Sequence, residues 1–248
     1  MNIAIATERR ERPATIASLP TETGTFRLVA VGDCNTSGMI GGHSSVPQAV
    51  AEWGQLRGMQ VELCNLGRTM YTSREGCAQL ADHTQPADGV IINFGLVDTW
   101  VTTFPKVYIE AYPDNLVRKH LRKYLKSIKR RLRKPWLRRI IPLGSMVSES
   151  EFRENFRAMV NVARKRNPVV RIAAWGTCLT DDLSRNELIE RYNTTIADLA
   201  QEMEFTYLDT VWLLNSLDRA ESHVDGIHLS QAAQRRIANA LGPALFGT

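Results

Sequence analysis

Two short segments far apart in the chain carry residue types suited to nucleophilic chemistry. Gly32-Asp33-Cys34 follows an apolar run, and a thiol at the start of a helix is expected to have a pKa below the ~8.5 of free cysteine. Asp225 and His228 lie three residues apart, so the carboxylate can hold one imidazole nitrogen while the other takes a proton from a nucleophile. These residues predict covalent catalysis through Cys34. The alternative is a buried structural cysteine, because free cysteine is often buried.

The elements that would position these residues alternate along the chain. Short apolar runs lie at 27–32, 60–65, 89–94, 169–175 and 205–208, and helical spacing of apolar residues lies at 46–56, 73–81, 149–166, 183–203 and 229–246. This alternation predicts an α/β fold, a three-layer α/β/α sandwich around a five-stranded parallel sheet. Such sheets bind ligands beyond the carboxyl ends of their strands. The residues directly after each strand, Cys34 among them, are therefore the candidates for chemistry.

Composition limits the other possibilities. A chain of 248 residues with 44% hydrophobic residues is long enough for one large α/β domain. We expect a poorly ordered arm at 1–25 and one domain over 26–248, without a secretory signal and without a membrane span. The four cysteines include no CxxC pair, which argues against a zinc site or a disulfide scaffold. We therefore expect a cytoplasmic protein with no metal and no organic cofactor.

Basic residues gather in one segment, an insertion expected at about 101–148. Between Arg118 and Arg139 there are twelve Lys or Arg and no Asp or Glu, which leaves 19 basic against 26 acidic residues elsewhere. An apolar stripe also runs along this segment, so it predicts a basic amphipathic helix. Three interpretations stay open: a lid packed on the body, a peripheral contact with an anionic membrane surface such as the inner membrane face, and contact with an anionic glycan or, less readily, a nucleic acid.

The pattern resembles the SGNH/GDSL hydrolase superfamily over about Leu28–Leu245. The first block of that family, GDS, reads Gly32-Asp33-Cys34 here, with cysteine in place of the nucleophilic serine, and its last block, DxxH, matches Asp225 and His228. The resemblance implies the flavodoxin-like SGNH fold and a Cys-His-Asp triad. It also implies an enzyme of the esterase or acyltransferase kind, acting on a small-molecule or glycan acyl substrate. The layout is similar to branches found among polysaccharide and secondary-metabolite biosynthesis genes.

The two middle blocks assign the rest of the site. The oxyanion-donating glycine of the family matches Gly67, whereas the oxyanion asparagine of the GxND block is replaced by Val97 in Gly95-Leu96-Val97-Asp98. We expect the backbone N–H groups of Cys34 and Gly67 to form the oxyanion hole, with Asn65 as the substitute donor, since one such donor can be worth about 3–4 kcal/mol. The candidates for contact with substrate are Asp33, Asn35, Gly95, Val97, Asp98 and Trp100.

Cysteine also changes the expected chemistry. An acyl-thiol intermediate is better poised than an oxygen ester to pass its acyl group to an amine or alcohol, so the residue leans the prediction from hydrolysis toward transfer. The competing interpretation is a non-catalytic module that binds a carbohydrate or lipid, or a scaffold in a biosynthetic complex. Asp33 could equally serve to organise the turn through backbone hydrogen bonds.

Overall fold

A computed structural model of the chain describes residues 24–38, 45–102 and 144–247. The basic helix expected at 118–139 and nearly all of the N-terminal arm expected at 1–25 lie outside these residues. Within them, five parallel strands form one sheet in the order β2-β1-β3-β6-β7. The strands are β1 (Phe26–Gly32), β2 (Val61–Asn65), β3 (Gly89–Asn93), β6 (Arg171–Trp175) and β7 (Thr206–Leu208). The five-stranded parallel sheet predicted from the apolar runs is confirmed.

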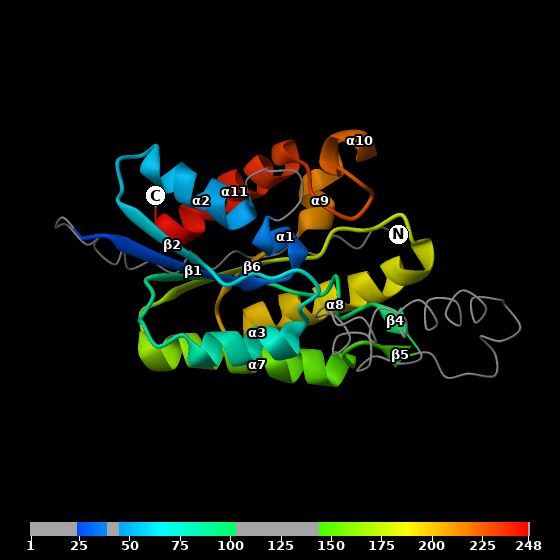
Figure 1. The fold of residues 1–248 in the computed structure, drawn as a ribbon, viewed down its shortest axis with the longest axis horizontal. Helices are drawn as coiled ribbons and strands as arrows, with labels where there is room; N and C mark the ends of the chain where they lie inside the picture. The colour runs from blue at the N-terminus through cyan, green and yellow to red at the C-terminus, as the bar shows by residue number, and fades with distance from the viewer. Residues whose placement is uncertain (1–23, 39–44, 103–143, 248) are drawn as a thin grey trace, which may run out of the picture.

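Helices cover both faces of this sheet (Figure 1). One layer holds α2 (Val46–Gln55) and α11 (Gln231–Phe246), and the other holds α3 (Ser73–Asp82), α7 (Glu149–Arg166) and α8 (Leu183–Glu202). Each helix follows from one of the sequence patterns with helical spacing. The structure is therefore the α/β/α sandwich that the sequence predicts.

Apart from the helix expected to begin at Cys34, the short elements have no counterpart in the sequence prediction. Three helices of four or five residues are α1 (Cys34–Ser37), α9 (Thr210–Leu214) and α10 (Arg219–Ser222). A two-stranded antiparallel sheet pairs β4 (Val101–Thr102) with β5 (Gly144–Ser145) at the two ends of the expected insertion. Each of these helices has fewer than two turns, and the small sheet has two residue pairs. Elements this short leave no periodic pattern in the sequence.

Local sequence explains where the long helices begin. Ser45, Ser148 and Ser230 precede α2, α7 and α11, and each hydroxyl accepts a hydrogen bond from a backbone N–H of the first turn. Thr72 begins α3 with a capping box, because the Glu75 side chain accepts in return from the Thr72 backbone N–H at 2.8 Å. Polar caps therefore set the start of four of the long helices: α2, α3, α7 and α11.

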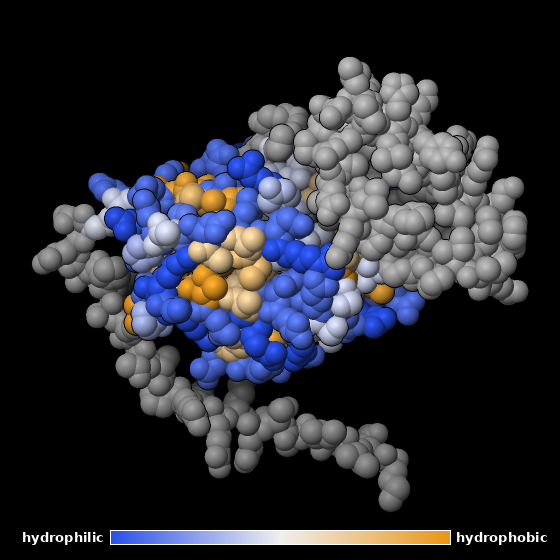
Figure 2. Space-filling model, turned by 60° about the horizontal axis from the view of Figure 1, so that its bottom comes forward, coloured by the Kyte–Doolittle hydropathy of each residue, from blue (hydrophilic) through white to orange (hydrophobic). Residues whose placement is uncertain are grey.

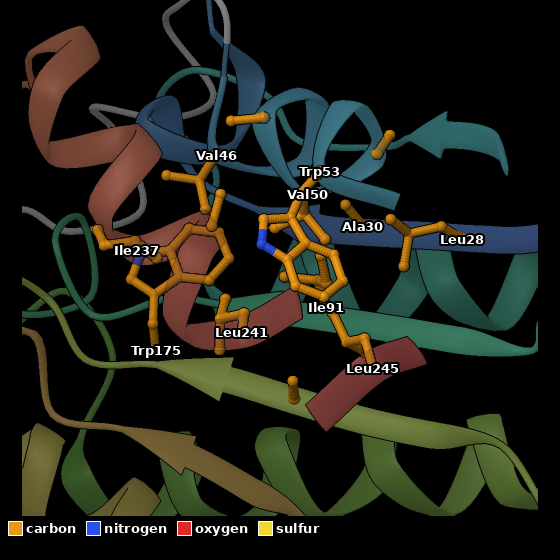
Figure 3. Packing of buried hydrophobic residues seen from close by; sticks show 14 of the residues in the cluster. Leu28, Ala30, Val46, Val50, Trp53, Ile91, Trp175, Ile237, Leu241 and Leu245 are labelled. Atoms are coloured by element: carbon orange, nitrogen blue, oxygen red, sulfur yellow. The ribbon is translucent and has the colours of Figure 1, made fainter. Parts of the chain in front are cut away.

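The sheet separates two apolar clusters, because successive side chains of a strand point to opposite faces. Leu28 and Ala30 of β1 belong to the cluster under α2 and α11, whereas Val29 and Val31 belong to the cluster under α3, α7 and α8. Figure 3 shows Trp53 of α2 and Leu245 of α11 within the first cluster. Both faces of β1 are thus buried, and this explains the unbroken apolar run that the sequence shows.

The surface over the α3–α7 layer is largely hydrophilic, with a patch of apolar residues at its centre (Figure 2). Ion pairs lie among these helices: Arg157 and Arg153 of α7 both reach Glu202 at the end of α8. Of the described helices, none has the length and apolar character needed to cross a membrane.

The closest approach between α2 and α11 yields a prediction of stability. A Cβ added at Gly242 would lie 2.4 Å from Cδ2 of Trp53. Alanine gains about 1 kcal/mol of helix propensity over glycine, but overpacking a core costs about 1–3 kcal/mol. We expect Gly242→Ala to lower the free energy of unfolding by up to about 2 kcal/mol in urea titrations.

The matched control is Asn239→Ala, on the exposed side of the same helix, which should stay within about 0.5 kcal/mol of the parent. A Gly242→Ala variant at least as stable as the parent would contradict this close packing of α2 against α11.

Candidate active site

The turn after β1 is built by residues that leave no room for extra atoms. A Cβ on Gly32 would lie 2.0 Å from Oγ1 of Thr36, so glycine is needed for the close approach. Asp33 then caps α1, since its Oδ1 accepts a hydrogen bond from the backbone N–H of Asn35 at 3.1 Å. Cys34 is therefore the first residue of α1, at the carboxyl end of the central strand pair.

The thiol of Cys34 is held in a nearly dry environment, with 9% of the residue exposed. Burial, reinforced by the charge of Asp33, raises the pKa of Cys34 above its ordinary value, against the opposing effect of two backbone N–H groups and of Arg185. The prediction of a lowered thiol pKa is therefore wrong, because desolvation of a thiolate outweighs the helix start. A raised pKa favours the neutral thiol, so a role as nucleophile would need a nearby base.

Asp225 and His228 form the pair that the sequence predicts for such a base. Nδ1 of His228 lies 2.7 Å from Oδ2 and 2.9 Å from Oδ1 of Asp225, and Oδ1 also accepts from the backbone N–H of His228 at 2.9 Å. Burial raises the pKa of Asp225, but the hydrogen bonds from His228 outweigh it and the net shift is downward. An ionised Asp225 fixes Nδ1 as the protonated nitrogen and leaves Nε2 to face a nucleophile.

One hydrogen bond brings this pair to the nucleophile turn. Oδ1 of Asn35 accepts from the backbone N–H of Leu229 at 3.0 Å, and the two residues are 194 positions apart. Asn35 follows Cys34 and Leu229 follows His228, so the bond sets the two halves of the predicted triad side by side. This is the role that the structure gives Asn35, which the sequence proposed as a substrate contact.

The loop after β2 lies against α1, but its donors are already in use. A Cβ on Gly67 would lie 2.8 Å from the backbone nitrogen of Ser37. The N–H of Gly67 donates to Oδ1 of Asn65 at 2.9 Å, and Nδ2 of Asn65 donates to the carbonyl oxygen of Thr36 at 2.8 Å. In this structure Asn65 braces the loop against α1, and neither residue presents the free oxyanion donor that the sequence expects. No described residue accepts a hydrogen bond from the N–H of Cys34.

The turn after β3 is organised by a buried carboxylate. Asp98 is fully buried and accepts from the backbone N–H groups of Ser73 at 2.9 Å and Gly95 at 3.1 Å. Burial raises the pKa of Asp98 to about 6. In this structure Asp98, proposed from the sequence as a substrate contact, has no exposed surface, and its hydrogen bonds tie the turn after β3 to the start of α3.

The other candidates from this turn differ in exposure. Val97 is 3% exposed and offers no polar atom, and Gly95 has a φ of +129° that a side chain would strain. Trp100 is half-buried, which leaves it as the candidate of this turn with surface for a substrate. Asp33 is fully buried and organises its turn by capping α1 rather than by touching a ligand.

The family assignment rests on a match across most of the chain. A family model described as the GDSL-like Lipase/Acylhydrolase family matches residues 30–236. The chain belongs to this family. No similar sequence was found among curated proteins.

Several solved structures share the fold of this GDSL-family chain at low sequence identity. Axe2, an acetylxylan esterase from Geobacillus stearothermophilus, matches with a TM-score of 0.59 and 18% identity, over 89% of this chain and 94% of that one. TesA matches with a TM-score of 0.55 and 18% identity, over 88% and 97%. A putative lipolytic G-D-S-L protein from Desulfitobacterium hafniense matches with 0.56 and 16%, over 88% and 99%. Three Axe2 structures are catalytic mutants that replace a serine, an aspartate or a histidine, the last two three positions apart.

Arg219 positions the Asp–His turn of this GDSL-family chain, and sequence reasoning missed it. Its Nη2 donates to the carbonyl oxygen of Gly226 at 2.7 Å, its Nη1 to that of Leu179 at 2.7 Å, and its Nε to Asp181 at 3.0 Å. The guanidinium therefore joins the loop after β6 to the turn that carries Asp225. Arg219 is the first residue of the four-residue helix α10 and belongs to no motif, so the sequence gives no signal for such a role.

Among the described residues, no three His, Cys, Asp or Glu side chains gather closely enough to hold a metal ion. The remaining cysteines differ in their exposure. Cys178 is buried, and burial raises its pKa to about 12. Cys64 lies in the edge strand β2 and is half-buried, and Cys77 is half-buried as well.

The buried carboxylate of Asp33 predicts a pH-dependent stability. Burial raises its pKa from 3.8 to about 7, and its Oδ2 finds no hydrogen-bond partner. The folded protein therefore binds this proton more tightly than the unfolded chain, and the contribution of Asp33 to stability falls as pH rises from about 4 to about 7. Asp33→Asn can keep the cap on α1 without the charge. We expect its melting temperature to equal that of the parent near pH 4 and to exceed it increasingly up to pH 7.

Each pKa unit corresponds to about 1.4 kcal/mol, so the gain at pH 8 should be at most a few kcal/mol. Asp198→Asn, an exposed change on α8, is the control and should show no such trend. A difference between Asp33→Asn and the parent that stays constant from pH 4 to pH 8 would contradict a buried, reluctant carboxylate.

Proposed function

We propose that this protein is an acyl-transfer enzyme that works through Cys34, His228 and Asp225. The reaction is hydrolysis of an ester or thioester, or transfer of its acyl group to an acceptor. The observation that carries the proposal is the hydrogen bond from Leu229 to Asn35, because it places the Asp–His pair at the turn that presents the thiol. Membership of the GDSL-like lipase/acylhydrolase family supports the same chemistry.

The first step follows from the state of each group. Nε2 of His228 takes the proton of the Cys34 thiol as Sγ attacks the carbonyl carbon of the substrate, so the thiolate forms only as the S–C bond forms. Asp225 stabilises the resulting imidazolium through Nδ1. His228 then gives that proton to the leaving oxygen or sulfur, and a thioester with Cys34 remains.

The oxyanion of this step needs donors aimed at the carbonyl oxygen. The N–H of Cys34 lies at the start of α1, where backbone donors have no partner within the helix. The N–H of Gly67 can join it after releasing Asn65 Oδ1, which accepts it at 2.9 Å in this structure. Substrate binding would thus exchange one hydrogen bond for another.

The second step decides between hydrolysis and transfer. Water or an acceptor alcohol or amine, deprotonated by His228, attacks the thioester, and the departing thiolate takes the proton back. A thioester is reactive toward amines and alcohols, which favours transfer when an acceptor is bound. The fold shared with an acetylxylan esterase supports a small-molecule or glycan ester as the acyl source, and a place in polysaccharide or secondary-metabolite biosynthesis fits such an acceptor.

One observation favours the alternative of a non-catalytic binding module. Cys34 is buried with a raised pKa, and Val97 contributes no donor to the turn after β3. A protein that binds an acyl-bearing carbohydrate or lipid without turning it over needs neither. The distinction is whether an acyl group ever bonds to Cys34.

The test is turnover together with covalent trapping. With p-nitrophenyl acetate as probe, Cys34→Ala should abolish turnover and His228→Ala should lower kcat by about two to four orders of magnitude. Intact-mass analysis of the rapidly quenched parent should show one acetyl group, and peptide mapping should place it on Cys34. Cys34→Ser should keep part of the hydrolysis.

Cys178→Ala is the control for a second buried thiol and should keep the activity of the parent. Added hydroxylamine or a sugar alcohol measures the share of acyl groups that escapes water. Full turnover in Cys34→Ala, or an acetyl group on another residue, would overturn the catalytic assignment.

A further inference from the structure

Arg185 is a charged residue where neither packing nor helix electrostatics favours one. It lies in the first turn of α8 (Leu183–Glu202) and is only 8% exposed. A cation near a helix N-terminus opposes the helix dipole, and a buried charge without a close partner is costly. Among the described residues, none forms a direct ion pair with Arg185. Arg185 is unfavourable for stability both in its position on the helix and in its burial, which suggests that it has a functional role.

Its guanidinium is fixed on the turn after β3. Nε donates to Oγ1 of Thr99 at 3.3 Å, while that hydroxyl donates to the carbonyl oxygen of Gly95 at 2.6 Å. Cζ lies 5.7 Å from the ring of Trp100, within the range of a cation–π contact. These contacts use one edge of the guanidinium. No acceptor in the part of the chain that the structure describes pairs with its Nη groups.

The turn that holds Arg185 adjoins the nucleophile turn, because Gly32 of β1 pairs with Asn93 of β3 and the backbone N–H of Asp33 donates to the carbonyl oxygen of Asn93 at 3.2 Å. The charge of Arg185 acts on both Asp33 and Cys34, lowering the pKa of the thiol against the larger effect of burial. Asp33 also has an unpartnered Oδ2 in this region. Arg185 is therefore the cation that the fold holds near a thiol that must become negative during the reaction.

We propose that Arg185 stabilises the negative charge that develops on Cys34 Sγ and on the substrate carbonyl oxygen as the acyl-enzyme forms. The proposal rests on the acyl-transfer function proposed above. It gives the site a charge-bearing donor where the N–H of Cys34 is otherwise the one unused donor among the oxyanion candidates. The competing explanation is a structural counter-ion that only balances Asp33.

Alkylation of Cys34 tests this without any substrate. Iodoacetamide reacts with the thiolate, so at each pH below the thiol pKa the rate falls tenfold when that pKa rises by one unit. We expect Arg185→Met to lower the Cys34 rate about tenfold or more between pH 7 and pH 9, and Arg185→Lys to stay within about threefold of the parent. Peptide mapping follows Cys178 in the same samples, where its unchanged rate serves as internal reference.

Turnover supplies the second readout. Arg185→Met should lower kcat with p-nitrophenyl acetate by about 10²–10³-fold with little change in KM, and Arg185→Lys should recover part of it. Arg191→Met is the matched control, because Arg191 lies on the exposed side of the same helix and pairs with Glu149. It should match the parent in both assays.

The outcomes separate the two proposals. An Arg185→Met variant that keeps the parent alkylation rate and kcat, and changes only the pH dependence of stability, overturns the role of Arg185 in favour of a counter-ion for Asp33. Turnover that persists in Cys34→Ala overturns the acyl-transfer function proposed for Cys34, while the alkylation result still decides what Arg185 does to the thiol.

If Arg185→Met does not fold, Thr99→Val removes the acceptor of Nε with little change in shape. A Cys34 alkylation rate lowered several-fold then supports the proposal, and an unchanged rate rejects it.

Discussion

The hydrogen bond between Asn35 and Leu229 is the constraint on which the site depends. Each partner adjoins a residue of the predicted triad, so a bond between a side-chain oxygen and a backbone N–H sets both in place at once. The rest of the fold makes this bond possible. Parallel pairing of β1 with β3 brings Gly32 level with Asn93, and the docking of α11 on α2 fixes the start of α11, directly after the turn that carries His228. The sheet thus supplies the edge that carries Cys34, and the turn before the last helix carries the Asp225–His228 pair.

Buried charge is the second theme of the site. Asp33, Asp98 and Arg185 are all buried within the turns that follow β1 and β3 or at the start of α8. The two carboxylates resist ionisation, and Asp98 is well supplied with backbone donors whereas Asp33 keeps one oxygen unpartnered. An environment that keeps Cys34 protonated at rest protects it from adventitious oxidation and alkylation, since the thiolate is the reactive form. Reactivity is then confined to the moment when His228 and a substrate are both in place.

The layers and the alternation of strands and helices were predictable because their signals are periodic and long. The apolar run of β1 and the spacing along α7 follow from burial on two faces or on one, and Gly32 and the Asp–His pair follow from motifs of a few residues. Asp98 and Asn65 were assigned to the ligand because a polar residue after a strand looks the same whether it faces solvent or braces a loop. Only the partners in space, Ser73 and Thr36, distinguish the two. The direction of the Cys34 pKa shift was also predicted wrongly, because the neighbouring residues in the sequence do not show how deeply the thiol is buried.

Arg185 and Arg219 are the residues of the candidate site that the sequence did not reveal at all. Each acts across loops that are distant in sequence, and neither occupies a recognisable motif. Their roles depend on the exact meeting of the turns after β3, β6 and α10, which short helices without a periodic pattern determine. The sequence motifs therefore point to Cys34, Asp225 and His228 but give no sign of Arg185 or Arg219.

The separation of 194 residues between Asn35 and Leu229 has a consequence for synthesis on the ribosome. The chain emerges from its N-terminal end at roughly 5–20 residues per second, so β1 and the Cys34 turn are made many seconds before α11. Until that helix docks, α2 and the apolar side of β1 lack their cover, and contacts of such long range form slowly. During this interval the apolar side of β1 stays open to solvent. The Cys34 turn and the Asp225–His228 pair therefore come together late in folding, once α11 has docked on α2.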